Sequence, residues 1–265
     1  MHSSENRSSR SRRHLKTLAA AAAAAALHAG QQASAATVGI HFRYLYGSTI
    51  GSTINTSGPD VFAGIPSSLW NNMAPISIDQ TPDGLPKAQI GQFLTTPGAT
   101  GISLDYSAKN AYGPYGAVTD SNAAYFSYLD DSEGDGFSGY TVTLHGLSTF
   151  LTPGESYSIT ALQSTDVVNA TFGSVFIYSG VGTSGPLLAT LNNTATLLFP
   201  GDAGTYGDTN ASPMLTADTI TIVGAPRVDD QRSTLAGLAI QSVPEPSTLL
   251  LLIAGMTVHL RRRRR

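Results

Sequence analysis

The sequence predicts an all-β fold, a β-sandwich, for the central part of this 265-residue chain. Glycine (27 residues) and proline (14) are frequent while charged residues make up only 12%, a balance typical of many short strands joined by turns. Apolar residues also alternate with polar ones, most clearly in 140–144 (Tyr-Thr-Val-Thr-Leu) and 219–223 (Thr-Ile-Thr-Ile-Val), as in strands with one buried face. No segment between the two chain ends shows the 3.6-residue period of an amphipathic helix.

Short β-rich runs recur along the body and are separated by turn residues such as Pro153-Gly154 and Pro200-Gly201. Strands are therefore expected at 38–46, 88–94, 101–106, 140–144, 157–162, 174–178, 187–191, 194–199, 219–223 and 235–241. No repeat of 20–50 residues is visible, which disfavours propellers and solenoids. About ten strands in one domain favour a β-sandwich of the jelly-roll type.

The charge distribution differs between the ends and the body. Ten of the 15 Lys and Arg residues lie before residue 17 or after residue 260, whereas residues 37–243 hold five cations and 16 acids, a net charge of −11. Nucleic acids require clustered cations, so nucleic acid is excluded as a partner. The chain has no cysteine, which excludes disulfides, thiolate metal sites and cysteine nucleophiles.

Residues 1–36 are predicted to be an export signal peptide with a helical core. Basic residues between Arg7 and Lys16 precede an alanine-rich apolar stretch, and 33–35 (Ala-Ser-Ala) supplies a small-x-small cleavage pattern. Cleavage is expected after Ala35 or Ala36. Both the general secretory route and the twin-arginine route fit this segment, and the former fits better.

Residues 242–265 are predicted to form a second targeting segment. Pro244, Glu245 and Pro246 precede an apolar run at 249–260, and five arginines end the chain. The run predicts a short transmembrane helix of ~18 Å against a hydrocarbon core of ~30 Å, with the arginines held on the cytoplasmic side.

This tripartite tail resembles the PEP-CTERM sorting signal of Gram-negative bacteria that carry an exosortase. The resemblance covers about 23 residues and assigns Pro244, Glu245 and Pro246 to the sorting and processing motif. It implies that the export machinery and an exosortase are partners, that the protein is anchored transiently in the inner membrane, and that it then reaches the cell surface or the extracellular space.

The body, residues 37–241, resembles uncharacterised PEP-CTERM proteins in short pieces. Those pieces include 39–42 (Gly-Ile-His-Phe), 70–72 (Trp-Asn-Asn) and 235–241. Their overall pattern is similar to that of galactose-binding-like jelly rolls, in which the last strand returns beside the first. The resemblance implies a fold and no established activity.

No catalytic residue is predicted, and the protein is expected not to be an enzyme. The body contains two histidines, His41 and His145, both inside expected strands. A Ser-His-Asp triad can be assembled only formally, because no G-x-S-x-G turn accompanies it. No H-E-x-x-H motif indicates a histidine metal site.

The densest acidic stretch gives one candidate cation site. Asp131, Glu133 and Asp135, followed by Gly136, resemble the first half of a calcium-binding loop. The twelfth position counted from Asp131 is Val142, so the bidentate glutamate is missing. We expect no cofactor and at most weak Ca²⁺ binding; a solvated hairpin connection is the favoured interpretation.

Trp70, Asn71 and Asn72 are the candidate carbohydrate contacts. A flat indole ring can stack on a sugar ring while amides bind its hydroxyls. The favoured alternative places Trp70, the one tryptophan of the chain, in the core of the sandwich.

Two hypotheses of function follow. The first is an exported, non-enzymatic protein of the cell surface or extracellular matrix, processed by an exosortase-type system. The second is a secreted carbohydrate-binding module or carbohydrate-active enzyme, with an extracellular polysaccharide as its partner. A cleft with two carboxylates beside an aromatic shelf would favour the enzyme.

Overall fold

The structure, a computed structural model, describes residues 35–77, 87–113, 118–130, 139–167, 171–193, 197–198, 205–225 and 231–243. The body, Ala35–Val243, packs together as one unit. In the described stretches, no helix is both long and apolar enough to cross a membrane. The expected transmembrane helix, and the signal peptide before Ala35, lie outside the described residues.

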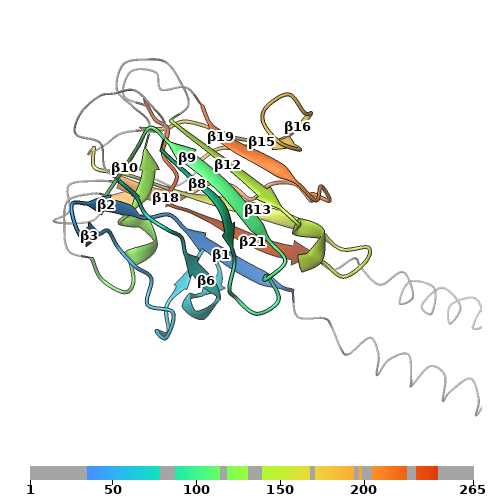
Figure 1. The fold of residues 1–265 in the computed structure, drawn as a ribbon, viewed down its shortest axis with the longest axis horizontal. Helices are drawn as coiled ribbons and strands as arrows, with labels where there is room; N and C mark the ends of the chain where they lie inside the picture. The colour runs from blue at the N-terminus through green and yellow to red at the C-terminus, as the bar shows by residue number, and fades with distance from the viewer. Residues whose placement is uncertain are drawn as a thin grey trace, which may run out of the picture. The chain divides into compact units, whose positions relative to one another are not determined.

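The first sheet has the two ends of the body side by side in its middle. β21 pairs antiparallel with β1 on one side and with β13 on the other, and β6 runs parallel to β1 (Figure 1). In spatial order its strands are β17 (Leu197–Leu198), β18 (Thr205–Asp208), β13 (Ser156–Thr165), β21 (Gly237–Val243), β1 (Thr37–His41) and β6 (Trp70–Asn72).

The second sheet is antiparallel throughout its described pairs. In spatial order its strands are β16 (Leu187–Leu191), β15 (Val175–Ser179), β19 (Ile220–Gly224), β12 (Tyr140–His145), β9 (Ser103–Ala108) and β8 (Lys87–Phe93). β9 alternates buried and half-buried residues along its whole length. This alternation is what a strand with one buried face requires.

Shorter elements complete the fold. A three-stranded sheet holds β3 (Thr49–Ile50), β2 (Tyr44–Tyr46) and β7 (Ile76–Ser77), and the two-stranded pairs are β4 (Val61–Phe62) with β5 (Ile65–Pro66), β10 (Asn110–Tyr112) with β11 (Tyr128–Asp130), and β14 (Thr171–Phe172) with β20 (Gln231–Arg232). The helical elements in the described part are short 3₁₀ turns, η1 (Ser67–Leu69), η2 (Ala123–Tyr125) and η3 (Leu147–Phe150).

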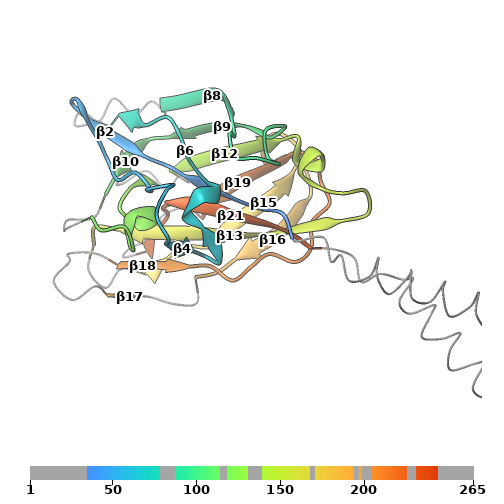
Figure 2. The same cartoon turned by 90° about the horizontal axis from the view of Figure 1, so that it is seen from below.

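Two hydrophobic clusters lie on opposite faces of the first sheet. The sandwich core joins Val38 and Ile40 of β1 to strands of the second sheet through residues such as Val142 and Ile222. The other face of the first sheet is covered by an outer layer, residues 51–69 and 119–128 (Figure 2). Because successive strand residues point to opposite faces, Gly39 and His41 face the outer layer.

The expectation of an all-β fold is confirmed, since every expected strand run coincides with one or more strands. The run at 38–46 is divided into β1 and β2 at Phe42 and Arg43, and only 197–198 of the run at 194–199 overlaps β17. Sequence patterns did not reveal β3, β4, β5, β6, β7, β10, β11, β14, β18 and β20. These strands are short or polar, and long-range pairing holds most of them.

Candidate functional site

The three candidate carbohydrate contacts are used inside the protein. Trp70 is only 2% exposed; its ring packs over Gly39, meets Phe62 edge-on, and its Nε1 donates to the Ile65 carbonyl at 3.2 Å. The Trp70 ring therefore has no open face on which a sugar could stack. The favoured interpretation, a core tryptophan, matches this position, although it fills the outer cluster rather than the space between the sheets.

The two asparagines after Trp70 hold loops in place. Asn71 Oδ1 accepts hydrogen bonds from the backbone N–H groups of Thr95 (2.8 Å) and Thr96 (3.2 Å), and its Nδ2 donates to the Gly39 carbonyl. The Asn72 amide exchanges two hydrogen bonds with the backbone of Ile54. Both side chains thus satisfy buried backbone groups and are not directed at a ligand.

The two histidines of the body lie in different surroundings. His41 is fully buried and contacts Ser52, with no carboxylate on its ring among the described residues. His145 is half-buried and lies 3.3 Å from Asp105. Neither belongs to a serine–histidine–carboxylate chain within the part of the protein that the structure describes.

Beside His145, a serine contacts a carboxylate directly. Ser148 donates from its backbone N–H and from its hydroxyl to Asp218 Oδ1, and these hydrogen bonds lower the pKa of Asp218. The lowered pKa makes this carboxylate a weak base for activating the serine. This group therefore caps η3 and offers no nucleophile.

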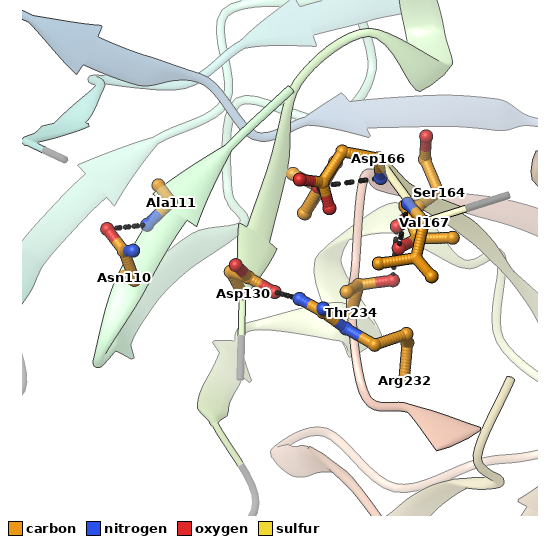
Figure 3. A network of polar contacts seen from close by, with 10 residues as sticks. Asn110, Ala111, Asp130, Ser164, Asp166, Val167, Arg232 and Thr234 are labelled. Carbon is orange, nitrogen blue, oxygen red and sulfur yellow. Dashed lines mark hydrogen bonds and ion pairs between the residues drawn. The ribbon is translucent and has the colours of Figure 1, made fainter. Parts of the chain in front are cut away.

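A buried ion pair joins β20 to β11 (Figure 3). The Arg232 guanidinium of β20 donates to Asp130 Oδ1 of β11 at 2.9 Å, and the two side chains are only 7% and 9% exposed. The sequence did not indicate this pair, because 102 positions separate its members. The only clue is that the body holds few cations, which makes each one a candidate for a specific partner.

A second polar pair lies beside the first. The Tyr128 hydroxyl donates to Asp166 Oδ1 and accepts from the Asp166 backbone N–H, both at 3.1 Å. Burial raises the pKa of Tyr128 well above its ordinary value, and the charges of Asp130 and Asp166 act in the same direction. Tyr128 therefore stays a neutral donor, and the network fixes the ends of β11 and β13.

The candidate calcium ligands Asp131, Glu133 and Asp135 lie outside the described residues. Their neighbour Asp130 is engaged by Arg232. Within the described stretches, no group of three or more His, Asp or Glu side chains is arranged to hold a metal ion. Weak calcium binding at residues 131–135 stays a prediction.

The outer face of the second sheet carries a row of polar and aromatic residues that sequence reasoning missed. The row runs across five strands through residues that lie directly opposite one another on neighbouring strands. Tyr178 lies two residues after Phe176 and therefore points to the same face. Most members are half-buried or exposed, whereas Val223 is 7% exposed. The row consists of Ser107, Thr141, Val223, Phe176 and Thr190.

The two ends of the body lie together. Ala36 N–H donates to Ser242 Oγ at 2.8 Å, and Ser242 N–H donates to the Ala36 carbonyl at 2.8 Å. Ala35 and Ala36, the expected cleavage positions, are exposed and half-buried. Cleavage after Ala35 retains both hydrogen bonds, whereas cleavage after Ala36 removes both. Pro244, Glu245 and Pro246 lie outside the described residues.

Comparisons with protein families, with curated proteins and with solved structures find no match for this chain.

Proposed function

We propose that this is an exported, non-enzymatic protein of the cell surface or extracellular matrix, sorted and C-terminally processed by an exosortase-type system. The observation that carries the proposal is the adjacency of the two ends of the body, at Ala36 and Ser242. A protein that enters the membrane with a signal peptide and is held by a C-terminal tail must offer both segments to one membrane. Neighbouring attachment points satisfy that need without unfolding the body.

The position of the Pro-Glu-Pro motif directly after the last strand supports the same proposal. β21 is flanked by strands on both sides and ends at Val243, immediately before the Pro-Glu-Pro motif. Proline cannot donate to a sheet ladder, so the motif begins with a residue that cannot extend the pairing of β21. A protease that recognises residues 244–246 can then act without breaking the pairing of β21.

We also propose that the sandwich is a jelly roll of the galactose-binding-like kind. Successive strands alternate between the sheets: β12 lies in the second, β13 in the first, β15 and β16 in the second, β18 in the first, β19 in the second and β21 in the first. The last strand also returns beside the first, as the resemblance implies. Both features support this topology.

The sorting proposal is tested by Glu245→Ala in a Gram-negative host that carries an exosortase. The wild-type protein is expected outside the cell, with its N-terminus at Ala36 or Thr37 and without the apolar run and arginines. The variant is expected to stay at full length in the inner membrane. Mass spectrometry of both ends of the protein in each cell fraction measures the outcome.

Asp120→Ala is the matched control, because it also removes one carboxylate, in this case from an exposed loop of the body. It should be processed and delivered like the wild type. An extracellular wild-type protein whose last peptide still ends in Arg265 contradicts the sorting proposal, and the tail is then an ordinary anchor.

The outer face of the second sheet favours a second candidate function, the binding of an extracellular polysaccharide. Phe176 and Tyr178 lie about 7 Å apart along β15 and offer apolar ring surface. Hydroxyl groups of Thr141, Thr190 and Ser107 on the same face can donate to and accept from sugar hydroxyls. Unlike Trp70, which is 2% exposed, Phe176 and Tyr178 on this face are half-buried.

We expect the exported protein to be retarded in native gels that contain a neutral polysaccharide, and Phe176→Ala with Tyr178→Ala to weaken that retardation at least tenfold in apparent affinity. Tyr46→Ala is the control, since this tyrosine is 53% exposed on a different sheet. Equal retardation of all variants, or none for the wild type on a panel of neutral glycans, removes the second candidate.

A further inference from the structure

His41 connects the first sheet to the outer layer. Its Nδ1 lies 3.2 Å from the carbonyl oxygen of Ala236, the residue before β21, and its Nε2 lies 3.1 Å from the carbonyl oxygen of Ser52 in the outer layer. Ser52 Oγ in turn donates to the Ala123 carbonyl at 2.8 Å. One line of polar contacts therefore runs from the sheet through His41 to both parts of the outer layer.

The number of protons on His41 decides how many of these contacts form. A neutral imidazole has a single N–H, yet both ring nitrogens face carbonyl oxygens. Ala236 O already accepts from the Phe42 N–H at 2.9 Å, whereas the contact of Nε2 with Ser52 O joins the two layers. In the neutral ring, the tautomer with its proton on Nε2 therefore donates to Ser52 O and joins the outer layer to the first sheet.

A second proton, on Nδ1, would be donated to the Ala236 carbonyl oxygen, but it would place a positive charge in the interior of the protein. The ring is fully buried, and burial is the main reason that the pKa of His41 falls to about 4; the positive charge of Arg43, just after β1, adds to this. When the ring reaches water, its pKa returns to about 6.5. Acid therefore favours any state in which His41 is hydrated.

The other charged groups of this region do not produce the same response. Among the described residues, Arg43 is the one charge that acts on His41; Asp60 and Asp120 belong to the outer layer but do not contact the ring. Asp208 of β18 accepts a hydrogen bond from Tyr125 of η2 at 2.6 Å, and burial raises its pKa. A carboxyl whose pKa is raised on folding stabilises the closed layer in acid, which is the opposite sign.

We propose that His41 is a pH-sensitive latch: the neutral ring keeps the outer layer on the first sheet, and protonation releases that layer while the two-sheet sandwich stays folded. The clusters make separate release feasible, since the apolar residues of the outer layer pack on one face of the first sheet and the sandwich core lies on the other. Release exposes Phe62, Ile65 and Trp70, an apolar surface that the closed form hides.

The sign and size of the effect follow from the two pKa values. The closed state has its full stability above pH ~6.5 and loses it as the pH falls toward 4, because the open state binds the additional proton first. A difference of about 2.5 between the pKa values shifts the opening equilibrium by roughly 300-fold across this range.

Trp70 reports the opening directly, because it is the one tryptophan of the chain and belongs to the cluster that would open. In the purified full chain we expect its emission to move to longer wavelength, and acrylamide quenching to increase, with a midpoint between pH 4 and 6.5. The far-UV circular dichroism of the strands should stay unchanged over that range. His41→Gln should abolish the transition, whereas His145→Gln, the other histidine of the body, should leave it in place.

Ser52→Ala tests the latch while the imidazole itself is kept, although the hydroxyl that it removes also lies 3.3 Å from His41 Nε2. It removes the hydroxyl that joins Ser52 to Ala123 but keeps the Ser52 carbonyl, so the midpoint should rise by roughly half to one pH unit. Asp208→Asn should not remove the transition. Fluorescence and circular dichroism that change together in one transition show global acid unfolding and overturn the proposal, as does an unaltered midpoint in both His41→Gln and Ser52→Ala.

Discussion

Replacing Gly39 with alanine is expected to destabilise the body by about 3 kcal/mol, the upper part of the usual cost of overpacking a core. A Cβ at Gly39 would lie 2.2 Å from Cδ2 and 2.5 Å from Cε2 of Trp70. The ring cannot move aside, because Phe62 packs against it, Ile65 accepts from its Nε1, and the rim of the ring also lies close to Gly237. Urea unfolding followed by circular dichroism measures the loss.

The cause of this loss is tested in a second background. In a Trp70→Leu variant the ring is absent, so adding Gly39→Ala should cost less than about 1 kcal/mol. The comparison separates the steric clash from any general effect of alanine in β1. If Gly39→Ala costs the same with and without the ring, the packing of Trp70 on Gly39 is not what requires glycine there.

Much of the fold could be predicted because the sandwich core follows local patterns. The alternation in 140–144 and 219–223 is visible without any partner, and both runs are central strands of the second sheet. Glycine and proline between the runs mark turns for equally local reasons. The pairing of the last strand with the first came from a resemblance and not from periodicity.

The region around Trp70 could not be predicted, because tertiary contacts hold its polar segments. Asparagine is disfavoured in strands, yet 70–72 forms β6 since Asn71 and Asn72 satisfy the backbone of Thr95, Thr96 and Ile54. For the same reason the burial of Trp70 could not be decided from its neighbours. It depends on Gly39 and Gly237, which leave room for the ring on the first sheet.

The candidate sites also differ in how far the sequence alone could predict them. The sorting motif is a linear signal, so residues 244–246 could be proposed directly. The outer face of the second sheet combines Phe176 and Tyr178 of β15 with Thr141 of β12, and no spacing in the chain shows that the two strands share this face. Which strand residues point into the core is decided by the other sheet, which covers one side.

The second large effect is expected at the buried ion pair of Asp130 and Arg232. Arg232→Met or Asp130→Leu alone should each cost about 3–5 kcal/mol, because either change removes the oppositely charged partner of a buried charge. Both side chains are less than 10% exposed, so water cannot replace the missing partner. Thermal and urea unfolding of the full chain measure the two losses.

The double variant distinguishes the charge pair from simple packing. Asp130→Leu with Arg232→Met removes both charges and retains apolar volume, so its cost should fall well below the sum of the two single costs, with a coupling of about 2–3 kcal/mol. The half-buried pair of His145 and Asp105 is the matched control, and His145→Gln with Asp105→Asn should show a coupling below about 1 kcal/mol. Additive costs at Asp130 and Arg232 would mean that the two side chains stabilise the body independently. In that case the pair does not join β11 to β20, and the ordered end of the sandwich depends instead on Tyr128 and Asp166.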